Sequence, residues 1–456
     1  MKTYDVIVVG SGSGAEIVDA AISHGMHTAW VDKGPLGGTC LNVGCIPSKI
    51  IIHPADQIME ILEAKKLGIT AEIKDIDFKA IMRRVQQPIQ ESHESMEQGI
   101  AHAENLEFYR DIGYFINDYT MKVGRAEIKG EKIFLSSGAR PLIPPIKGLN
   151  LVPYLTNENV FSLTEKPSSM VIIGGGYIAA EFAHFFSAVG TSVTIIQRSN
   201  RLIPNVEPEI SELLKKQLMK RMQIYLNTEV SEVNKQGKSI TVTALDSTTG
   251  KVQTVSAETI FVAAGRVSNA DLLKVENTGV QTDARGFIQV NDSLETSKKN
   301  IWALGDAIGK AMFKHVANEE AVVAWRNAFH EKKSKMDYQT IPYAVFTYPE
   351  IAAVGLTEAE AKKHHQILVG TARYADVAKG DAMMEYDGFA KAIVDKKDGK
   401  ILGFHIIGPY APMLIQEVIN GMALGGNIAF VSHGMHIHPA LPELILRTFG
   451  NLRDVE

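Results

Sequence analysis

The stretch DVIVVGSGSGA, residues 5–15, decides the fold that we expect for this chain. An apolar β-branched run leads into three closely spaced glycines, Gly10, Gly12 and Gly14. A helical pattern follows, and a second apolar run, residues 27–31, ends at Asp32. Strand, glycine turn, helix, strand and acid, in this order, form the fingerprint of a dinucleotide-binding βαβ unit. The glycines let the backbone approach a pyrophosphate, the helix N-terminus supplies N–H donors, and Asp32 can accept hydrogen bonds from ribose hydroxyls.

The same pattern returns in residues 170–196, so the sequence predicts a second dinucleotide site. Its small residues are Gly174, Gly176 and Ala179. Where the first unit ends in an acid, this one ends in Gln197, followed by Arg198 and Arg201. An acid at this place binds a ribose 2′-hydroxyl, whereas arginine suits a 2′-phosphate. We therefore expect NADP(H) rather than NAD(H), the alternative being that both arginines are solvated surface residues.

The two cysteines of the chain, Cys40 and Cys45, both lie in GGTCLNVGCIPSK, residues 37–49. In one continuous helix their Cα atoms would lie about 8 to 9 Å apart, beyond the roughly 7 Å that a disulfide can bridge. If they pair, we expect Cys40 on a loop and a helix that starts near Cys45, with Pro47 in its first turn. The helix N-terminus would lower the pKa of Cys45. The spacing thus predicts a redox pair.

Two other interpretations of the cysteines are weaker. A structural disulfide closing so short a ring stabilises a fold by only about 2 kcal/mol, which a chain of 456 residues does not need. A zinc site wants three or four Cys or His ligands at close spacing, and the sequence has no further cysteine. We predict no metal site.

Composition narrows the class of protein. The length of 456 residues predicts about three domains. The net charge is −5 and no long Lys/Arg run occurs, which argues against binding to nucleic acid or to an anionic membrane. The N-terminal apolar run is too short for a signal peptide, and no apolar stretch approaches the roughly 18 residues of a membrane span. With only two cysteines, we expect a cytoplasmic protein whose partner is a small molecule.

The rest of the chain is predicted to form further helices and a separate C-terminal unit. Residues 58–103 have the period of two antiparallel helices, and residues 314–330 that of another helix. From residue 341 the pattern changes to strands followed by helices, which predicts a smaller α+β unit. Near its end stands His438, followed five residues later by Glu443. Such a pair can orient a general base, although a His-rich loop is often only a surface loop.

These motifs resemble one family, the class I FAD-dependent pyridine nucleotide-disulfide oxidoreductases, which includes dihydrolipoamide dehydrogenase and the mycothione and glutathione reductases. The resemblance rests on the cysteine stretch and, in the order of the family, on GGGYIAAEF, VAAGR, ALGD and HPALPE. It implies an α/β fold with two Rossmann-like dinucleotide-binding domains and a C-terminal α+β dimerisation domain. The implied boundaries are residues 1–148 for the first part of the FAD-binding domain, 149–268 for the NAD(P)-binding domain, 269–338 for the second part of the FAD-binding domain, and 339–456 for the dimerisation domain.

The resemblance also implies roles for individual residues. The implied FAD-binding residues are Gly10, Gly12, Gly14, Asp32, Lys49, Ser137, Gly138, Asp306 and His315. The implied NAD(P)-binding residues are Gly174, Gly176, Ala179, Arg198, Arg201 and Gly265. The implied catalytic residues are Cys40, which attacks the substrate, Cys45, whose thiolate faces the flavin, the ion pair Lys49 and Glu181, and the acid/base pair His438 and Glu443 of the partner subunit.

By this resemblance the chain forms a homodimer that passes electrons from NAD(P)H through FAD and the Cys40/Cys45 disulfide to a small-molecule disulfide, in the service of redox homeostasis. The alternative is a dihydrolipoamide dehydrogenase that oxidises protein-bound dihydrolipoamide with NAD, in contact with a lipoyl-bearing complex. Residues 401–418 resemble that enzyme, whereas residues 314–321 resemble mycothione reductase. Mercuric reductase or an FAD-dependent oxidase is less favoured. A flavin-binding protein without chemistry would not need the intact cysteine, histidine and glutamate set.

Overall fold

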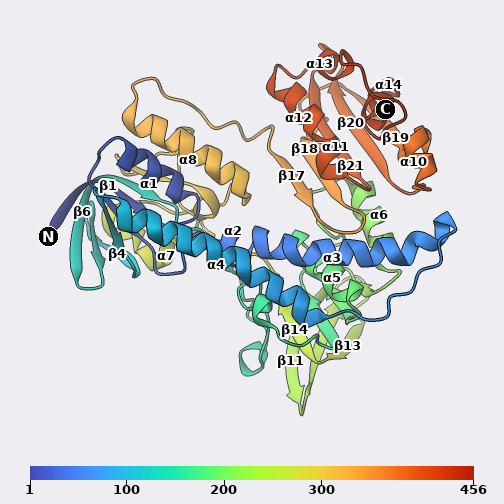
Figure 1. Cartoon of the computed structure of the whole chain (residues 1–456), viewed down its shortest axis with the longest axis horizontal. Coiled ribbons are helices and arrows are strands. Elements are labelled where there is room, and N and C mark those ends of the chain that lie inside the picture. The colour runs from blue at the N-terminus through green and yellow to red at the C-terminus, as the bar shows by residue number, and fades with distance from the viewer. Residues whose placement is uncertain (456) are drawn as a thin grey trace.

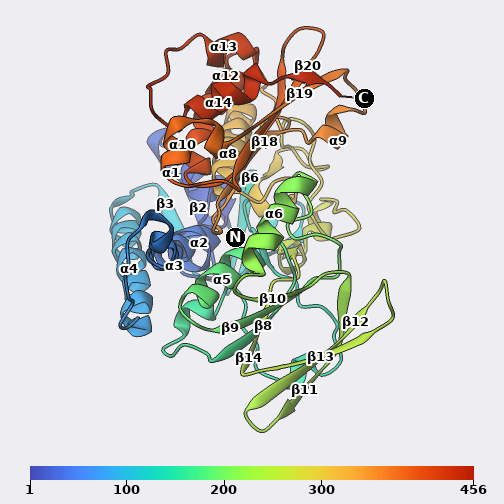
Figure 2. The same ribbon diagram turned by 90° about the vertical axis from the view of Figure 1, so that its right-hand side faces the viewer.

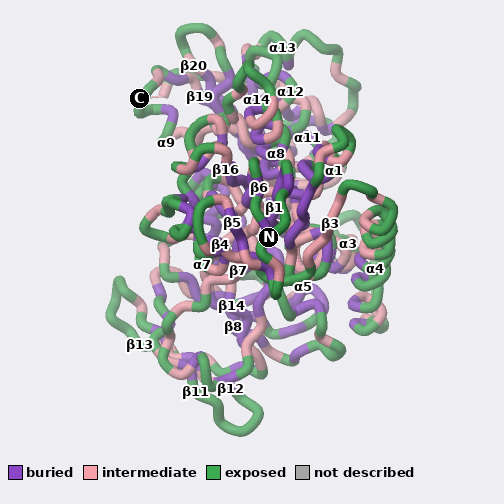
Figure 3. Tube along the Cα trace, turned by 90° about the vertical axis from the view of Figure 1, so that its left-hand side faces the viewer, coloured by how far each residue is buried: buried purple, intermediate pink, exposed green. Residues whose placement is uncertain are grey.

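The computed structural model describes residues 1–455, and in this range the strands form five sheets. The first sheet has the order β3-β2-β1-β6-β5-β4, and β16 also pairs with β6. Its parallel strands are β1 (Lys2–Val9), β2 (Thr28–Val31), β3 (Leu106–Tyr109), β6 (Ala126–Leu135) and β16 (Ile301–Ala303). The antiparallel strands are β4 (Gly113–Asn117) and β5 (Thr120–Val123). The second halves of the central strands, residues 6–9 of β1 and 133–135 of β6, are continuous apolar runs that lie buried in the middle of the unit (Figure 3), because both faces of the sheet are covered there.

The first sheet and the helices packed on it form what we call the first unit. Two of these helices come from distant parts of the sequence. Helix α1 (Gly14–Ser23) follows the glycine turn and lies against α8 (Lys314–Phe329) in Figure 1. The buried core accordingly joins early residues such as Ile17 to late ones such as Ala321. The short α7 (Ala270–Leu273) and the 3₁₀ turns η4 (Val275–Thr278) and η5 (Gly305–Ala307) belong to the same region. The first unit is therefore assembled from two separate parts of the sequence.

The nucleotide unit, which we define as residues 149–265, contains the second βαβ pattern. Its parallel sheet has the order β10-β9-β8-β14, from β8 (Ser169–Ile173), β9 (Ser192–Ile196), β10 (Gln223–Tyr225) and β14 (Thr259–Val262). Its helices are α5 (Tyr177–Ala188) and α6 (Pro208–Leu218), with 3₁₀ turns η2 (Leu149–Leu151) and η3 (Val160–Ser162). An antiparallel sheet lies below this parallel sheet in Figure 2. It is made of β11 (Thr228–Gln236), β12 (Ser239–Asp246) and β13 (Val252–Ala257). The chain enters and leaves the nucleotide unit through a two-stranded ladder of β7 (Ala139–Pro141) and β15 (Arg266–Ser268).

The C-terminal unit is built on a six-stranded sheet of order β17-β18-β21-β20-β19-β22. Its strands are β17 (Pro342–Val345), β18 (Ile351–Gly355), β19 (Ile367–Arg373), β20 (Phe389–Asp395), β21 (Ile401–Ile407) and β22 (Arg453–Asp454). Its helical segments are α9 (Glu358–Ala361), η6 (Tyr374–Asp376), α10 (Ala378–Ala382), α11 (Ala411–Leu414), α12 (Gln416–Ala423), α13 (Ile428–Ser432) and α14 (Glu443–Gly450). Strands followed by helices are what the pattern after residue 341 predicts.

The cysteine stretch forms two helices rather than a loop and a helix. Cys40 lies in α2 (Gly38–Val43), and α3 (Cys45–Glu63) starts at Cys45 with Pro47 in its first turn. The expected start of α3 is confirmed, but the expected loop at Cys40 is wrong. Gly44 breaks the helix with φ −136° and ψ −116°, and a Cβ there would lie 2.7 Å from the Thr39 carbonyl oxygen. This break removes the helical separation that would keep the two sulfurs apart.

Two long antiparallel helices lie between the two βαβ units, as expected, but the first of them, α3, lies mostly before residue 58, where the expected range began. α3 continues into η1 (Ala64–Leu67), and α4 (Phe78–His102) returns in the opposite direction (Figure 1). Asp77 caps α4 by accepting a hydrogen bond from the Ala80 N–H. Two parallel-sheet βαβ units and a C-terminal α+β unit confirm the predicted fold class, while the domain boundaries stay predictions. Within residues 1–455 no helix combines the length and the apolar character needed to cross a membrane.

Candidate functional site

A cavity of about 1510 Å³ opens where the glycine turn, the cysteine helices, α5, α8 and the end of β17 meet. Gly10 enters it with φ +101°, and a Cβ there would lie 2.2 Å from the Ser136 carbonyl oxygen. At Gly14 a Cβ would lie 2.2 Å from Ser136 Oγ, so this glycine serves close packing and does not line the cavity. Gly12 has open space at its Cα. The turn therefore presents bare backbone to the cavity, as a phosphate cradle requires.

Asp32 fixes the shape of this turn. Its Oδ2 accepts a hydrogen bond from the Ser11 N–H at 2.6 Å, and its Oδ1 accepts one from the Gly34 N–H at 2.8 Å. All six remaining predicted FAD-binding residues line the cavity: Asp32, Lys49, Ser137, Gly138, Asp306 and His315. His315 lies at the start of α8, and its Nε2–H donates a hydrogen bond to the Pro342 carbonyl oxygen at 2.8 Å. Its backbone is thus at a helix N-terminus facing the cavity.

The unpaired polar atoms of the cavity wall fit a large hydroxylated ligand. Ser11 Oγ and Ser137 Oγ are buried and have no hydrogen-bond partner among the described residues, and both serines line the cavity. Buried hydroxyls without a partner are rare in folded proteins. Together with the glycine turn and the two helix N-termini, they fit the pyrophosphate and ribityl hydroxyls of FAD.

Glu320 of α8 positions the turn that carries Asp306. Its Oε2 accepts a hydrogen bond from the Gly305 N–H at 2.6 Å, and its Oε1 accepts one from the Tyr338 hydroxyl at 2.7 Å. Burial raises the pKa of Glu320 to about 7. Asp306 lies 3.2 Å from Arg266 Nε, and burial raises its pKa too. Sequence reasoning found Asp306 through its motif but missed Glu320, because nothing local marks a helical glutamate as the support of a distant turn.

The two cysteines are free thiols in contact with each other at the cavity wall. The hydrogen bond with Cys40 lowers the pKa of Cys45 to about 7, against the effect of burial. The Lys49 ammonium and the Cys45 backbone N–H at the start of α3 lower it further. The pKa of Cys40 is raised, because its thiol hydrogen-bonds Cys45 and is itself buried. Cys45 is therefore the more acidic thiol of the pair.

Lys49 and Glu181 join α3 to α5 across the cavity. Lys49 Nζ lies 2.8 Å from Glu181 Oε2, and Glu181 is 5% exposed. Glu181 Oε1 also accepts a hydrogen bond from the Phe346 N–H at 3.0 Å, and Lys49 Nζ lies 4.4 Å from the centre of the Phe346 ring. Phe346 was not found from the sequence. The ion pair places one charge from α3 and one from α5 beside the thiols.

Tyr177 is a third residue that the sequence reasoning missed, although it stands in the GGGYIAAEF motif. It is the first residue of α5, lines the cavity and lies with its ring 6.1 Å from that of Phe313. Burial raises its pKa to about 12. A tyrosine at the junction of the cavity and the second glycine turn separates the two expected nucleotide sites.

The second glycine turn has the same construction as the first. Gly174 has φ +118°, and a Cβ there would lie 2.2 Å from the Ala263 carbonyl oxygen. Gly176 precedes α5 with open space at its Cα, while Ala179 is fully buried in the packing behind it. Gly265 closes the neighbouring strand turn with φ +129°. None of these residues lines the cavity described above, whereas Tyr177 and Glu181 of the helix that follows do.

The loop that follows β9 carries the residues expected to read the ribose. Gln197 is buried, and its Nε2 donates to Ser199 Oγ at 2.6 Å, so its side chain serves the loop itself. Arg198 is exposed. Arg201 is half-buried, and its Nε lacks a hydrogen-bond partner among the described residues. A buried guanidinium nitrogen without a partner is a candidate donor to an anionic group.

His438 and Glu443 form the predicted pair. His438 Nδ1 lies 2.8 Å from Glu443 Oε1, and the Ala440 N–H donates to Glu443 Oε2 at 3.0 Å. These two contacts, the backbone one first, lower the pKa of Glu443. The His438 side chain is 70% exposed and is not among the residues that line the cavity. Within one chain the structure does not bring this pair to the cysteines.

A flavin-sized cavity, a thiol pair on its wall and a second dinucleotide-binding unit together define a flavin-dependent disulfide oxidoreductase. The family model for pyridine nucleotide-disulphide oxidoreductases matches residues 4–326, and the model of the dimerisation domain of the same family matches residues 341–448. The chain belongs to the pyridine nucleotide-disulphide oxidoreductase family. It is an oxidoreductase that uses FAD and a pyridine nucleotide, and it carries the dimerisation domain of the family.

Individual relatives span nearly the whole chain. Mycothione reductase of Mycobacterium tuberculosis is 36% identical over 466 residues, which cover 99% of this chain and 100% of the relative. Dihydrolipoyl dehydrogenase of a Synechocystis species is 32% identical over 464 residues, covering 97% of each. Among solved structures, the HOCl-induced flavoprotein disulfide reductase RclA of Escherichia coli, as a Cu(II) complex, has a TM-score of 0.87 at 27% identity and 99% coverage of both chains.

Proposed function

We propose that the protein is a homodimeric reductase that uses NADPH to reduce a small-molecule disulfide in a reducing cytoplasm. The observation that carries this proposal is the thiol pair on consecutive helices at the cavity, with the pKa of Cys45 lowered to about 7. A pair in which one thiol is ionised at neutral pH and the other stays protonated suits disulfide exchange better than structural cross-linking. A pair that cycles between dithiol and disulfide also suits a compartment that keeps other thiols reduced.

The proposed chemistry can be followed on the chain's own residues. When bound, FAD supplies hydride acceptance from the nicotinamide and delivery of the electron pair to the Cys40–Cys45 disulfide. Lys49, paired with Glu181, supplies a positive charge beside Cys45 and so stabilises its thiolate. Cys40 then attacks one sulfur of the substrate disulfide, forming a mixed disulfide and releasing the first thiolate product.

The second half of the cycle restores the starting disulfide. Cys45 attacks the sulfur of Cys40, which forms the intrachain disulfide and releases the second thiolate. The partner subunit's His438, oriented by the partner subunit's Glu443, takes the proton of Cys40 and returns it to a leaving thiolate. The overall balance is one NADPH, one proton and one disulfide giving one NADP⁺ and two thiols.

NADPH is proposed over NADH because no carboxylate ends the second fingerprint. Gln197 is turned into its own loop, and Arg198 and Arg201 stand beyond it. A carboxylate at this place would repel a 2′-phosphate, whereas an arginine forms charge-assisted hydrogen bonds with it.

Oxidation of protein-bound dihydrolipoamide with NAD⁺ is the second candidate, favoured by the 32% identity to a dihydrolipoyl dehydrogenase over 97% of the chain. It requires the opposite nucleotide preference. It also requires a substrate presented on a lipoyl-bearing complex rather than free in solution.

Steady-state turnover of the holoenzyme separates the two candidates. Mycothione, glutathione disulfide and lipoamide would be compared as acceptors, each with NADPH and with NADH. The proposal expects a free disulfide to be reduced with a higher kcat/KM for NADPH. Fast turnover of lipoamide alone, with a strong preference for the NAD couple, contradicts the proposal and supports the second candidate.

A further inference from the structure

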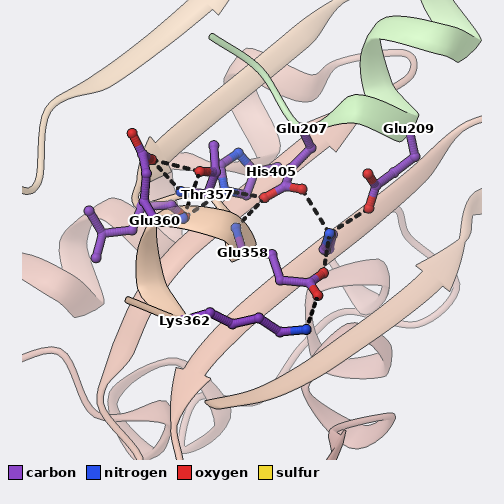
Figure 4. Close-up of polar contacts among 9 residues, drawn as sticks. Glu207, Glu209, Thr357, Glu358, Glu360, Lys362 and His405 are labelled. Atoms are coloured by element: carbon purple, nitrogen blue, oxygen red, sulfur yellow. Dashed lines mark hydrogen bonds and ion pairs between the residues drawn. The ribbon is translucent and has the colours of Figure 1, made fainter. Parts of the chain in front are cut away.

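A buried lysine joins the nucleotide unit to the C-terminal sheet. Lys391 of β20 is 3% exposed, and its Nζ is surrounded by three carboxylates: Glu207 Oε2 at 2.8 Å, Glu209 Oε1 at 2.5 Å and Glu358 Oε2 at 2.7 Å. In Figure 4, Glu207 and Glu209 come from the nucleotide unit at the top, and Glu358 comes from the C-terminal unit below them. We call these four residues the lysine cluster. An ammonium group with three donors is fully used by three such acceptors.

The cluster is held by the backbone as well as by charge. Glu207 is 1% exposed, and its other oxygen, Oε1, accepts a hydrogen bond from the Glu358 N–H at 2.6 Å. Lys362 lies 3.1 Å from the other oxygen of Glu358. The three carboxylates stand close enough to suit a metal ion, but the Lys391 ammonium already lies among them. The cluster is therefore an internal ion pair rather than a cation site.

Glu207 stands at the end of the loop that carries the two arginines. This nucleotide loop, residues 197–206, runs from the end of β9 to Glu207, the residue before α6. On one side it is tied to the second glycine turn, because the Ile203 N–H donates to the Gly175 carbonyl at 2.7 Å. On the other side Ser211 Oγ donates to the Leu202 carbonyl at 2.7 Å. Any movement of Glu207 is thus passed to the loop within a few residues.

The C-terminal sheet also contacts the loop directly. The hydroxyl of Tyr343, on β17, lies 3.4 Å from the Asn205 carbonyl oxygen. With Lys391 this makes two attachments from the C-terminal unit, one on the loop and one at its end. We propose that Lys391 is a positioning residue that fixes the nucleotide loop from the C-terminal sheet and thereby sets the affinity for the 2′-phosphate of NADP(H).

This inference rests on the proposed use of NADPH, so its test separates the two. The probes are 2′,5′-ADP, which carries the 2′-phosphate, and 5′-AMP, which does not. Isothermal titration of each into the oxidised holoenzyme measures the adenosine end of the site without any turnover. If wild-type protein binds 5′-AMP as tightly as 2′,5′-ADP, the proposed NADPH preference itself fails.

Given that preference, Lys391→Met should weaken 2′,5′-ADP binding by about 2- to 30-fold, the range found when residues outside a site alter coupling to it. Binding of 5′-AMP should change much less, because the glycine turn and α5 still hold the 5′-phosphate. Lys391→Arg, which keeps the charge, should stay close to wild type. Glu358→Gln, which leaves two carboxylates on Lys391, gives a milder form of the same loss if Lys391→Met does not fold.

Lys216→Met is the matched control. Lys216 also joins α6 to the C-terminal unit, through Asp387 at 3.2 Å, but from the end of α6 far from the loop. It should leave the ratio of the two affinities unchanged. The inference is overturned if folded Lys391→Met or Glu358→Gln protein binds both probes as wild type does, or if the two affinities fall by the same factor. It is also overturned if Lys216→Met lowers the ratio as much as Lys391→Met.

Discussion

Cys45 owes its low pKa to a hydrogen bond from its neighbour Cys40, to the Lys49 ammonium and to its place at the start of α3. The first of these is the strongest and the easiest to remove. The pair is thus asymmetric for a physical reason: the Cys40 thiol donates a hydrogen bond to Cys45, which lowers the pKa of Cys45 and raises that of Cys40.

Replacing Cys40 by Ala should raise the pKa of Cys45 from about 7 toward the ordinary thiol value of 9. Because the pKa in the native pair lies below that value, the thiolate is present above about pH 7 and is lost as the pH falls through 7. The long-wavelength absorbance that a thiolate gives beside the bound flavin follows this titration. In the Cys40→Ala holoprotein its midpoint should lie higher than in the two-electron-reduced wild type.

Thr39→Ala is the control for this titration, because Thr39 is exposed, next to Cys40, and leaves both sulfurs in place. An unchanged midpoint in Cys40→Ala would mean that Lys49 and the helix terminus alone set the pKa.

At the scale of elements, the cavity is shaped by supports that come from a distance along the chain. Glu320 on α8 receives two hydrogen bonds, one from Gly305 and one from Tyr338, and so holds η5 where Asp306 faces the cavity. Both partners donate to Glu320 in the structure, so both of its oxygens act as acceptors, whereas a glutamine has only one acceptor oxygen.

Glu320→Gln should weaken FAD retention and lower stability by about 1–3 kcal/mol, since one buried donor loses its acceptor. The wild type should also show a pH dependence from this group. Its folded pKa of about 7 lies above the unfolded value of 4.5, so its contribution to stability is fully present below about pH 4.5 and is lost as the pH rises to 7. Thermal unfolding from pH 4.5 to 8, with FAD release followed by fluorescence, checks both effects.

Glu319→Gln serves as the comparison, because Glu319 is the adjacent residue on α8 and is exposed. The assignment is wrong if both variants release FAD at the same temperature as the wild type.

Features that depend on neighbouring residues could be predicted from the sequence, whereas contacts between residues far apart in the chain could not. Glycine turns, the strand ends and the start of α3 depend on neighbours along the chain, and their motifs were sufficient. The six-residue helix α2 was missed, since so short a segment between glycines shows no helical period. Glu320, Phe346 and Lys391 were missed because their partners lie far away in the sequence, and only the packed structure brings them together.

At the scale of the whole molecule, the segment around His438 carries large apolar side chains that are exposed. Met435 is fully exposed, Ile437 is 77% exposed and Phe430 is 55% exposed, although all three are large and apolar. Exposed apolar residues in one place mark an interaction surface. Together with the dimerisation domain of the family, this surface supports a two-fold dimer in which each His438 faces the cysteines of the other subunit.

Mixing Cys40→Ser protein with His438→Gln protein should restore activity that neither has alone. After random exchange of subunits, half of the dimers are mixed and each has one intact site, so about a quarter of the wild-type rate is expected. Native mass spectrometry confirms the exchange, and disulfide-dependent NADPH oxidation reports the rate. If mixed dimers form and remain inactive, the base that serves Cys40 comes from the same chain.

Strand β6 pairs with two different strands along one edge. These two strands are far apart in the sequence and are therefore synthesised at very different times. Its first half pairs with β5, whereas its second half pairs with β16, residues Ile301–Ala303. The last parallel strand of the nucleotide unit ends at Val262, so the whole nucleotide unit is synthesised before β16. Until then the second half of the β6 edge has no partner strand. Asp306 and α8, which close the cavity, emerge only after β16. We therefore expect FAD to bind late in biosynthesis, after α8 has been synthesised.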